Sequence, residues 1–248
     1  MPDPGALIAI GGHEDHENDL RVLRVVAARV GDGPLALVAA ASRRPERYVE
    51  KYVATFGRLG VTVVPVPADG TGAVDILAWA GGVFLTGGKQ ARLVEFLTRH
   101  ALSDDLRSVH HRGGVIAGTS AGASALAEVM MLRGPGTSSP GSADIELGHG
   151  LGLIPGVIID QHFAERGRGG RLRAAVAARP DCVGIGLDED TAAEFHGGSF
   201  VVHGSGAVTV IDARGSRVRP GGGRRPATMH DARLHILADG DAFSLRGA

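Results

Sequence analysis

The stretch that most constrains the fold of this chain is a short apolar run that leads into a glycine-flanked serine, over residues 115–126. It reads Val-Ile-Ala-Gly-Thr-Ser-Ala-Gly-Ala-Ser-Ala-Leu, which predicts a buried strand, a tight turn and a helix of small residues. Residues 118–122 match the Gly-x-Ser-x-Gly elbow, in which a strained backbone holds the serine hydroxyl clear of the sheet. The pattern predicts a nucleophilic Ser120, with the backbone N–H of Ala121 facing a developing oxyanion. A chain with 39 glycines can contain this pattern by chance, so the pattern alone leaves two interpretations: a catalytic serine, or a serine without a catalytic role in a glycine-rich turn. The rest of the sequence is needed to choose between them.

Length and composition narrow the class of protein. A chain of 248 residues, 44% hydrophobic, predicts one α/β domain over residues 1–248 rather than two small ones. A net charge of −1 with interspersed signs argues against a nucleic-acid or membrane surface. The single cysteine, Cys182, excludes an intramolecular disulfide and makes a cysteine-based zinc site implausible. With no signal-peptide pattern and no apolar run of about 20 residues, we expect a soluble, cytoplasmic protein.

Apolar runs alternate with helical patterns along most of the chain. We expect buried strands over 6–10, 35–41, 61–66, 82–86, 114–117, 156–163 and 183–187. Helical spacing is found over 20–26, 45–59, 74–80, 91–100 and 104–112, and again up to residue 178. Connections too long for hairpins predict a mainly parallel sheet with helices on both faces. Residues 130–150 are expected to form an irregular loop, and residues from about 192 to 248 an antiparallel C-terminal extension.

Three glycine-rich segments follow predicted strands: Gly11-Gly12, residues 87–90 and the Ser120 elbow. In parallel sheets ligands gather at the carboxyl ends of the strands, so these segments predict a site lined by backbone. The segment after Gly12 reads His-Glu-Asp-His-Glu and allows two interpretations, a metal site or a solvated, acid-rich helix N-terminus. We favour the second and expect no metal.

A nucleophilic serine needs an imidazole to take its proton and a carboxylate to orient that imidazole. Among eleven histidines, His162 is the best candidate because it ends a predicted strand and follows the polar Asp160 and Gln161. Glu189 or Asp188, at the end of the next strand, would supply the carboxylate. The resulting chain order of serine, histidine and acid differs from the serine, acid, histidine order of α/β-hydrolases.

These segments together resemble the peptidase family that contains cyanophycinase and the aspartyl dipeptidase peptidase E, and they match cyanophycinase best. The resemblance is carried by residues 10–15, 85–90, 118–123, 159–172 and 184–192, and it spans about residues 6 to 212. It implies a flavodoxin-like fold related to class I glutamine amidotransferases, usually dimeric, with a serine-peptidase mechanism and neither metal nor cofactor. Ser120 would be the nucleophile, His162 the general base and Glu189 the orienting acid, with Gly88 and Ala121 at the oxyanion.

The resemblance also implies a set of pocket residues: Gln90, Asp160, Gln161, Arg166, Arg168 and Arg171. Cyanophycin is a polyaspartate chain with arginine joined to each side-chain carboxyl, and the family releases β-Asp-Arg dipeptides from its end. Arginines suit such a substrate because they pair bidentately with carboxylates, although a solvated helix start is the alternative for this block. Lys89 is a further expected substrate-binding residue, and it departs from the family, which usually has an acidic or amide residue there. A cation at this position would either strengthen oxyanion or carboxylate binding or repel a guanidinium-bearing substrate, so it bears on the choice of substrate.

The expected partner is therefore a peptide or β-aspartyl polymer, acted on by a homodimer. Other functions remain open at this stage: an α-aspartyl dipeptidase, a hydrolase of another β-aspartyl compound, or a non-catalytic small-molecule-binding domain. The block of three arginines favours cyanophycin over a dipeptide, and the presence of Ser120, His162 and Glu189 argues against a mere binder. A cysteine-dependent amidotransferase is disfavoured because the elbow holds serine.

Overall fold

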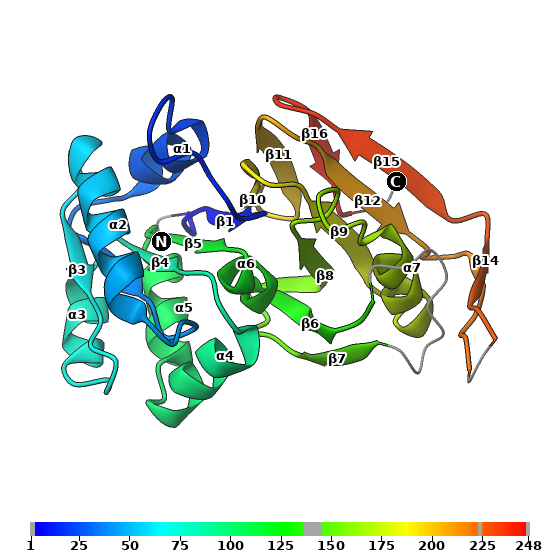
Figure 1. The fold of residues 1–248 in the computed structure, drawn as a ribbon, viewed down its shortest axis with the longest axis horizontal. Helices are drawn as coiled ribbons and strands as arrows, with labels where there is room; N and C mark the ends of the chain where they lie inside the picture. Colours follow the sequence, from blue (N-terminus) through cyan, green and yellow to red (C-terminus); the bar gives the residue numbers. More distant parts are fainter. Residues whose placement is uncertain (1–2, 136–144, 223–224, 247–248) are drawn as a thin grey trace.

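A computed structural model describes residues 3–135, 145–222 and 225–246 and places most strands in two sheets (Figure 1). The larger sheet has eight strands in the spatial order β16 (Ala242–Ser244), β11 (Ser199–Gly204), β10 (Thr191–His196), β1 (Leu7–Ile10), β5 (Val115–Thr119), β4 (Gly82–Leu85), β2 (Leu35–Val38) and β3 (Val63–Pro65). The second has six, in the order β15 (Arg233–Leu237), β12 (Val208–Asp212), β9 (Val183–Leu187), β8 (Ile154–Gln161), β6 (Ala127–Arg133) and β7 (Glu146–His149). A small ribbon pairs β13 (Arg217–Arg219) with β14 (Thr228–His230).

In the larger sheet, β1, β5, β4, β2 and β3 run parallel to one another. All but the edge strand β3 are buried on both faces, as their continuous apolar runs predict. Alternate residues of β1 join different apolar clusters: Leu7 and Ala9 pack on one side, and Ile8 and Ile10 on the other. Helices cover both faces of this sheet. Helices α1 (Arg21–Arg29) and α2 (Pro45–Arg58) pack on the face that carries Ile8 and Ile10. Helices α3 (Ala73–Trp79), α4 (Gln90–Arg99) and α5 (Ser103–His111) pack on the face that carries Leu7 and Ala9. The expected helix-covered parallel sheet is thus confirmed.

The second sheet is built around β6, β8 and β9, which are mutually parallel. One of its faces is covered by α7 (Gly169–Ala178), whose Leu172 and Val176 pack with Ile158. From the other face, Val157 and Ile159 enter the same apolar cluster as Leu7 and Ala9. Apolar packing therefore runs without interruption from one sheet to the other.

Of two expectations about the second half of the chain, the structure corrects one and confirms the other. Residues 130–150 are not an irregular loop throughout, because β6 continues to Arg133 and β7 pairs with it in antiparallel register; residues 136–144 lie outside the described part. The expected antiparallel strands at the C-terminus are confirmed, and both sheets receive them. Strands β10, β11 and β16 add to the larger sheet beside β1, while β12 and β15 add to the second sheet beside β9.

The carboxyl ends of β1, β5 and β8 meet where the two sheets come together. Beyond β1, the carbonyl of Gly11 accepts a hydrogen bond from His162 N–H at 2.9 Å, and the carbonyl of Gly12 accepts one from Asp190 N–H at 2.9 Å. The loops after β8 and β9 are therefore fixed against the end of β1. No helix in the described ranges is long and apolar enough to cross a membrane.

Candidate active site

Ser120 occupies a sharp turn between β5 and α6 (Ala121–Leu126), with φ 52° and ψ −108°. This left-handed conformation is strained for a residue with a side chain, and such strain concentrates at functional sites. The flanking glycines allow close approach: a Cβ on Gly118 would lie 2.5 Å from the carbonyl oxygen of Gly122, and one on Gly122 would lie 2.8 Å from the carbonyl carbon of Leu85. Ser120 N–H donates to the carbonyl of Ile10 at 2.9 Å, which fixes the turn to β1.

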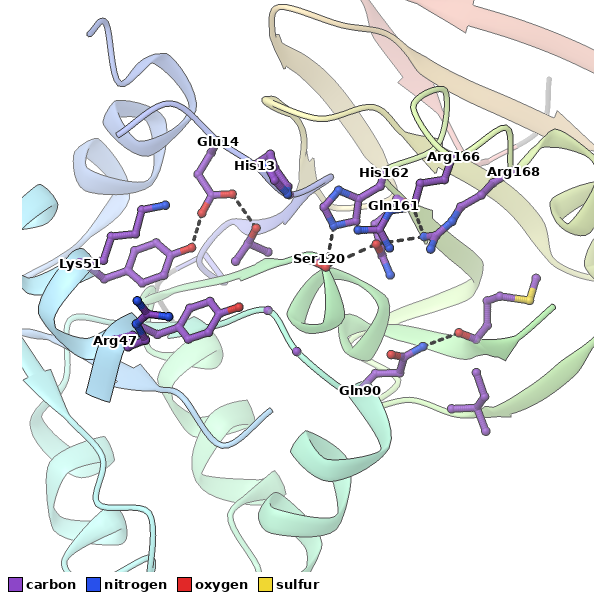
Figure 2. A pocket seen from close by; sticks show the side chains of 18 of the residues that line it. His13, Glu14, Arg47, Lys51, Gln90, Ser120, Gln161, His162, Arg166 and Arg168 are labelled. Atoms are coloured by element: carbon purple, nitrogen blue, oxygen red, sulfur yellow. Dashed lines mark hydrogen bonds between the residues drawn. The ribbon is translucent and has the colours of Figure 1, made fainter. Parts of the chain in front are cut away.

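Three side chains from separate strand ends form a line of short contacts. Ser120 Oγ lies 3.0 Å from His162 Nε2, and His162 Nδ1 lies 2.6 Å from Glu189 Oε1 (Figure 2 shows the first contact). A neutral imidazole that donates Nδ1–H to Glu189 accepts the Ser120 proton at Nε2, the arrangement that a general base requires. Asp188, the other candidate acid, accepts instead from Ala164 N–H and Ala207 N–H, both at 3.0 Å.

The environment of His162 keeps its imidazole available as a base. The ring is buried, and burial lowers its pKa below the usual value of 6.5, although the hydrogen bond to Glu189 acts in the opposite direction. Nearby Arg166 and His13 also lower this pKa. His162 is therefore neutral at pH 7, as acceptance of a proton from serine demands.

Two backbone N–H groups are candidates for an oxyanion hole beside Ser120. Ala121 is the first residue of α6, where an N–H has no acceptor within the helix. Gly88 lines the same cavity, and among the described residues its N–H donates no hydrogen bond. Gly87, just before it, is so close that a Cβ there would lie 3.7 Å from Ser120 Oγ. An oxyanion hole formed by Gly88 and Ala121 therefore stays a prediction.

The predicted pocket residues divide between groups that face the cavity and groups that support its wall. Asp160 is fully buried and pairs with Arg168 and Arg171; Arg171 Nε lies 2.6 Å from its Oδ2. Arg168 also donates to the carbonyl of Gln161 and, at 3.1 Å, to its side-chain Oε1, which lies 3.4 Å from Ser120 Oγ. Burial dominates the lowering of the Arg168 pKa to about 10, against the attraction of Asp160.

The remaining two predicted pocket residues, Gln90 and Arg166, have different settings from each other and from Lys89. Gln90 lines the cavity and donates from Nε2 to the carbonyl of Met131 at 2.5 Å. Arg166 also lines the cavity, and no side-chain hydrogen bond or ion pair occupies its guanidinium within the described part of the chain. Lys89 is exposed at the N-terminal cap of α4 and is not among the residues that line the cavity.

Sequence reasoning missed Glu14, which lines the cavity and is only 5% exposed. The carboxylate accepts from Tyr52 Oη–H and, at 2.7 Å, from Thr119 Oγ1–H, next to Ser120 (Figure 2). Burial alone would raise its pKa, but His16, Tyr52 and Thr119 outweigh it and lower the pKa to about 2. The interpretation of this segment as a solvated helix N-terminus was thus wrong for Glu14. The available signal was Tyr52, because the hydroxyl of a buried tyrosine needs a hydrogen-bond acceptor such as a carboxylate.

The same segment places His13 beside the contacts that join Ser120, His162 and Glu189. His13 Nε2 lies 3.9 Å from Glu189 Oε1, and its ring stands edge-on to that of His162 with centroids 5.3 Å apart. One possible ligand atom from each of these three residues lies within 4.8 Å of the other two. Two imidazoles and a carboxylate are a donor set that zinc accepts. Helix α1 begins only at Arg21, so this loop is not part of a helix.

The cavity at this site measures about 750 Å³ and spans both sides of Ser120. One wall comes from the end of β8 and the segment after it, with Gln161, Arg166 and Arg168. The opposite wall, which the sequence analysis did not anticipate, is a face of α2 (Figure 2). Its lining residues are Arg47, Tyr48, Lys51 and Tyr52. A cavity of this size can hold an extended peptide across the hydroxyl of Ser120.

In comparisons with known proteins, a family model, two relatives and a solved structure point to peptidases. The model of peptidase family S51 matches residues 7–203. A cyanophycinase of Nostoc sp. strain PCC 7120 is 38% identical over 255 residues, covering 97% of this chain and 85% of the relative. One from Synechococcus elongatus is 36% identical, covering 98% and 80%. A solved peptidase from an acI-B1 Actinobacterium shares the fold, with a TM-score of 0.71 at 20% identity, over 98% of this chain and 97% of that one.

Proposed function

The chain belongs to peptidase family S51 and is a serine-type peptidase, and we propose that it is an exopeptidase that releases β-Asp-Arg dipeptides from cyanophycin. The observation that carries this proposal is the line of contacts from Ser120 Oγ to His162 Nε2 and from His162 Nδ1 to Glu189 Oε1, at 3.0 and 2.6 Å. It lies in a cavity with cationic side chains on either side of the serine.

The proposed reaction follows from these contacts. His162 Nε2 takes the proton of Ser120 as its Oγ attacks the carbonyl carbon of the scissile peptide bond. The N–H groups of Gly88 and Ala121 stabilise the negative charge that develops on the carbonyl oxygen. His162 then gives the proton to the leaving amine, the C–N bond breaks, and the acyl group stays on Ser120. A water molecule, deprotonated by His162, releases the acyl group and restores the serine.

Two facts support cyanophycin as the substrate. The relatives named cyanophycinase are similar to this chain over nearly its whole length. In addition, the cavity presents arginine and lysine side chains, which suit a polymer with one free arginine carboxylate per unit. Lys89 lies outside the cavity lining, so its departure from the family pattern does not weigh against this substrate.

The test is incubation of the purified protein with cyanophycin and, separately, with α-Asp-X dipeptides, with products identified by mass spectrometry. We expect release of β-Asp-Arg from the polymer, and no release by Ser120→Ala with an unchanged circular dichroism spectrum. Cleavage of the α-aspartyl dipeptides alone would replace the proposal with an α-aspartyl dipeptidase. Cleavage of neither would refute the substrate assignment and direct the search to other β-aspartyl compounds.

The active form in this proposal is a homodimer. Supporting it, Leu234 and Ile236 are 63% and 69% exposed on β15, an edge strand of the second sheet. Sedimentation equilibrium of the purified protein at several concentrations measures the state directly, with twice the chain mass expected.

A further inference from the structure

The α2 wall of the cavity carries two cations that the reaction above does not use. Arg47 and Lys51 are four residues apart on α2, so they lie on the same face of the helix. Both are exposed, both line the cavity that contains Ser120, and Tyr48 and Tyr52 lie beside them (Figure 2). We call this set of four residues the α2 subsite.

The charges of the α2 subsite are available to a ligand. Within the described ranges, neither the Arg47 nor the Lys51 side chain forms an ion pair or a hydrogen bond. Glu14, the acid that lines the same cavity, accepts hydrogen bonds from Tyr52 and Thr119 instead. Two neighbouring cations without a counter-ion repel each other at a cost that a bound anion would remove.

The opposite wall offers fewer free cations than its sequence suggests. Of its three arginines, Arg168 and Arg171 share the single buried carboxylate of Asp160, whereas Arg166 has no such partner among the described residues. Positive charge therefore lies on both sides of Ser120: Arg166, together with the Arg168–Arg171 pair, on one side and the α2 subsite on the other (Figure 2). A substrate that crosses the serine meets both.

The position of His162 assigns each side of the cavity to a part of the substrate. His162 gives its proton to the leaving amine, so the leaving unit must lie on its side of Ser120. Arg166 lies on that side, close enough to influence the His162 pKa. The acyl portion of the substrate then extends toward α2.

We propose that Arg47 and Lys51 bind the free carboxylate of the arginine in the acyl-side unit of the substrate. This inference rests on the proposed function and extends it by naming a second recognition point. A guanidinium pairs with a carboxylate through two parallel hydrogen bonds, and an ammonium adds a point charge beside it. With Arg166 on the other side, the enzyme binds one substrate carboxylate on each side of the bond that it cleaves.

The test uses two synthetic substrates of two β-Asp-Arg units each, with the acyl-side arginine carboxylate either free or amidated. For the wild-type protein we expect amidation to lower kcat/KM about 10- to 100-fold, the range for a charge-assisted hydrogen-bonded pair. In Arg47→Gln/Lys51→Gln, kcat/KM for the free carboxylate should fall by a similar factor, mainly through KM. Amidation should then have no further effect.

A matched control is Arg43→Gln/Arg44→Gln, which removes the same charge from exposed positions just before α2 and outside the cavity lining. It should discriminate between the two substrates as the wild type does. Discrimination retained by Arg47→Gln/Lys51→Gln, or lost in the control, would overturn the subsite alone. Hydrolysis of neither substrate by the wild type would overturn the proposed function and the subsite with it.

Discussion

The imidazole of His162 packs directly on the backbone of Gly12, so closely that a Cβ on Gly12 would lie 2.7 Å from Nε2. This is the ring nitrogen that lies 3.0 Å from Ser120 Oγ. The carbonyl of the neighbouring Gly11 accepts a hydrogen bond from His162 N–H. The turn after β1 thus supplies both the space for the proposed base and the hydrogen bond that positions its backbone.

Gly12→Ala should therefore damage catalysis more than folding. The added methyl would push the imidazole away from Ser120, and the backbone at φ 103° disfavours any side chain. We expect kcat to fall about 100-fold or more, with a loss of about 1–3 kcal/mol in the free energy of unfolding. Gly57→Ala is the control, because nothing lies within 4 Å of its Cβ in α2; its activity should be unchanged and its stability slightly higher. Wild-type kcat in Gly12→Ala would contradict this role.

The lowered pKa of His162 sets the acid limb of the pH profile. Because the base must be neutral, kcat/KM should rise with pH through a pKa below 6.5 and then level off. Glu189→Gln removes a group that raises the His162 pKa, so the limb should move to still lower pH while kcat falls steeply. Initial rates between pH 4 and 9 measure both effects. A limb above pH 6.5, or a limb in Glu189→Gln at higher pH, would be inconsistent with this assignment.

The arginines after β8 should separate into two classes by their effects. Arg171→Gln removes one of the two guanidiniums that pair with the buried Asp160 and leaves only Arg168, so we expect a loss of about 1–3 kcal/mol in the free energy of unfolding. Arg166→Gln removes a side chain that faces the cavity without a partner, and it should raise KM with little change in thermal stability. Thermal melts measure the stability of both variants, and Michaelis–Menten kinetics measure their KM and kcat. Equal melting temperatures would mean that the buried pair contributes nothing to the fold.

Zinc should inhibit the enzyme through His13, His162 and Glu189. Binding there would require the proton on His162 Nδ1 to leave and would take the proposed base out of the reaction. We expect inhibition that strengthens as pH rises and is reversed by a chelator. His13→Ala should need a higher zinc concentration for half inhibition, whereas His149→Ala, exposed on β7, should not. Equal sensitivity of His13→Ala and the wild type would rule out this site.

The sequence was sufficient where a function depends on local pattern. The Ser120 elbow, the strand ends that carry His162 and Glu189, and the parallel sheet all follow from apolar runs and small residues close together in the chain. Strand positions alone left Asp188 and Glu189 open, and only the family resemblance pointed to Glu189 before the structure was known. Both follow the same strand, and only the path of the loop directs one toward the imidazole and the other toward backbone N–H groups.

The sequence was insufficient where partners are distant along the chain. Glu14 looks solvated in its acid-rich segment, yet its partner Thr119 is 105 residues away. Strand β7 becomes recognisable only through its pairing with β6, because Glu146–His149 lacks a clear alternation of apolar residues. Arg47 and Lys51 look like the polar face of an amphipathic helix until the cavity beside them is known.

The central claim, that Ser120 is the nucleophile, is tested most directly by labelling with a fluorophosphonate, which reacts with activated serines, followed by peptide mass spectrometry. We predict one adduct per chain, on the peptide that contains Ser120, with hydrolysis lost in proportion to labelling. Ser120→Ala and His162→Ala should remain unlabelled, because the first lacks the hydroxyl and the second lacks its base. Full activity in a protein labelled at Ser120, or in Ser120→Ala itself, would contradict the account.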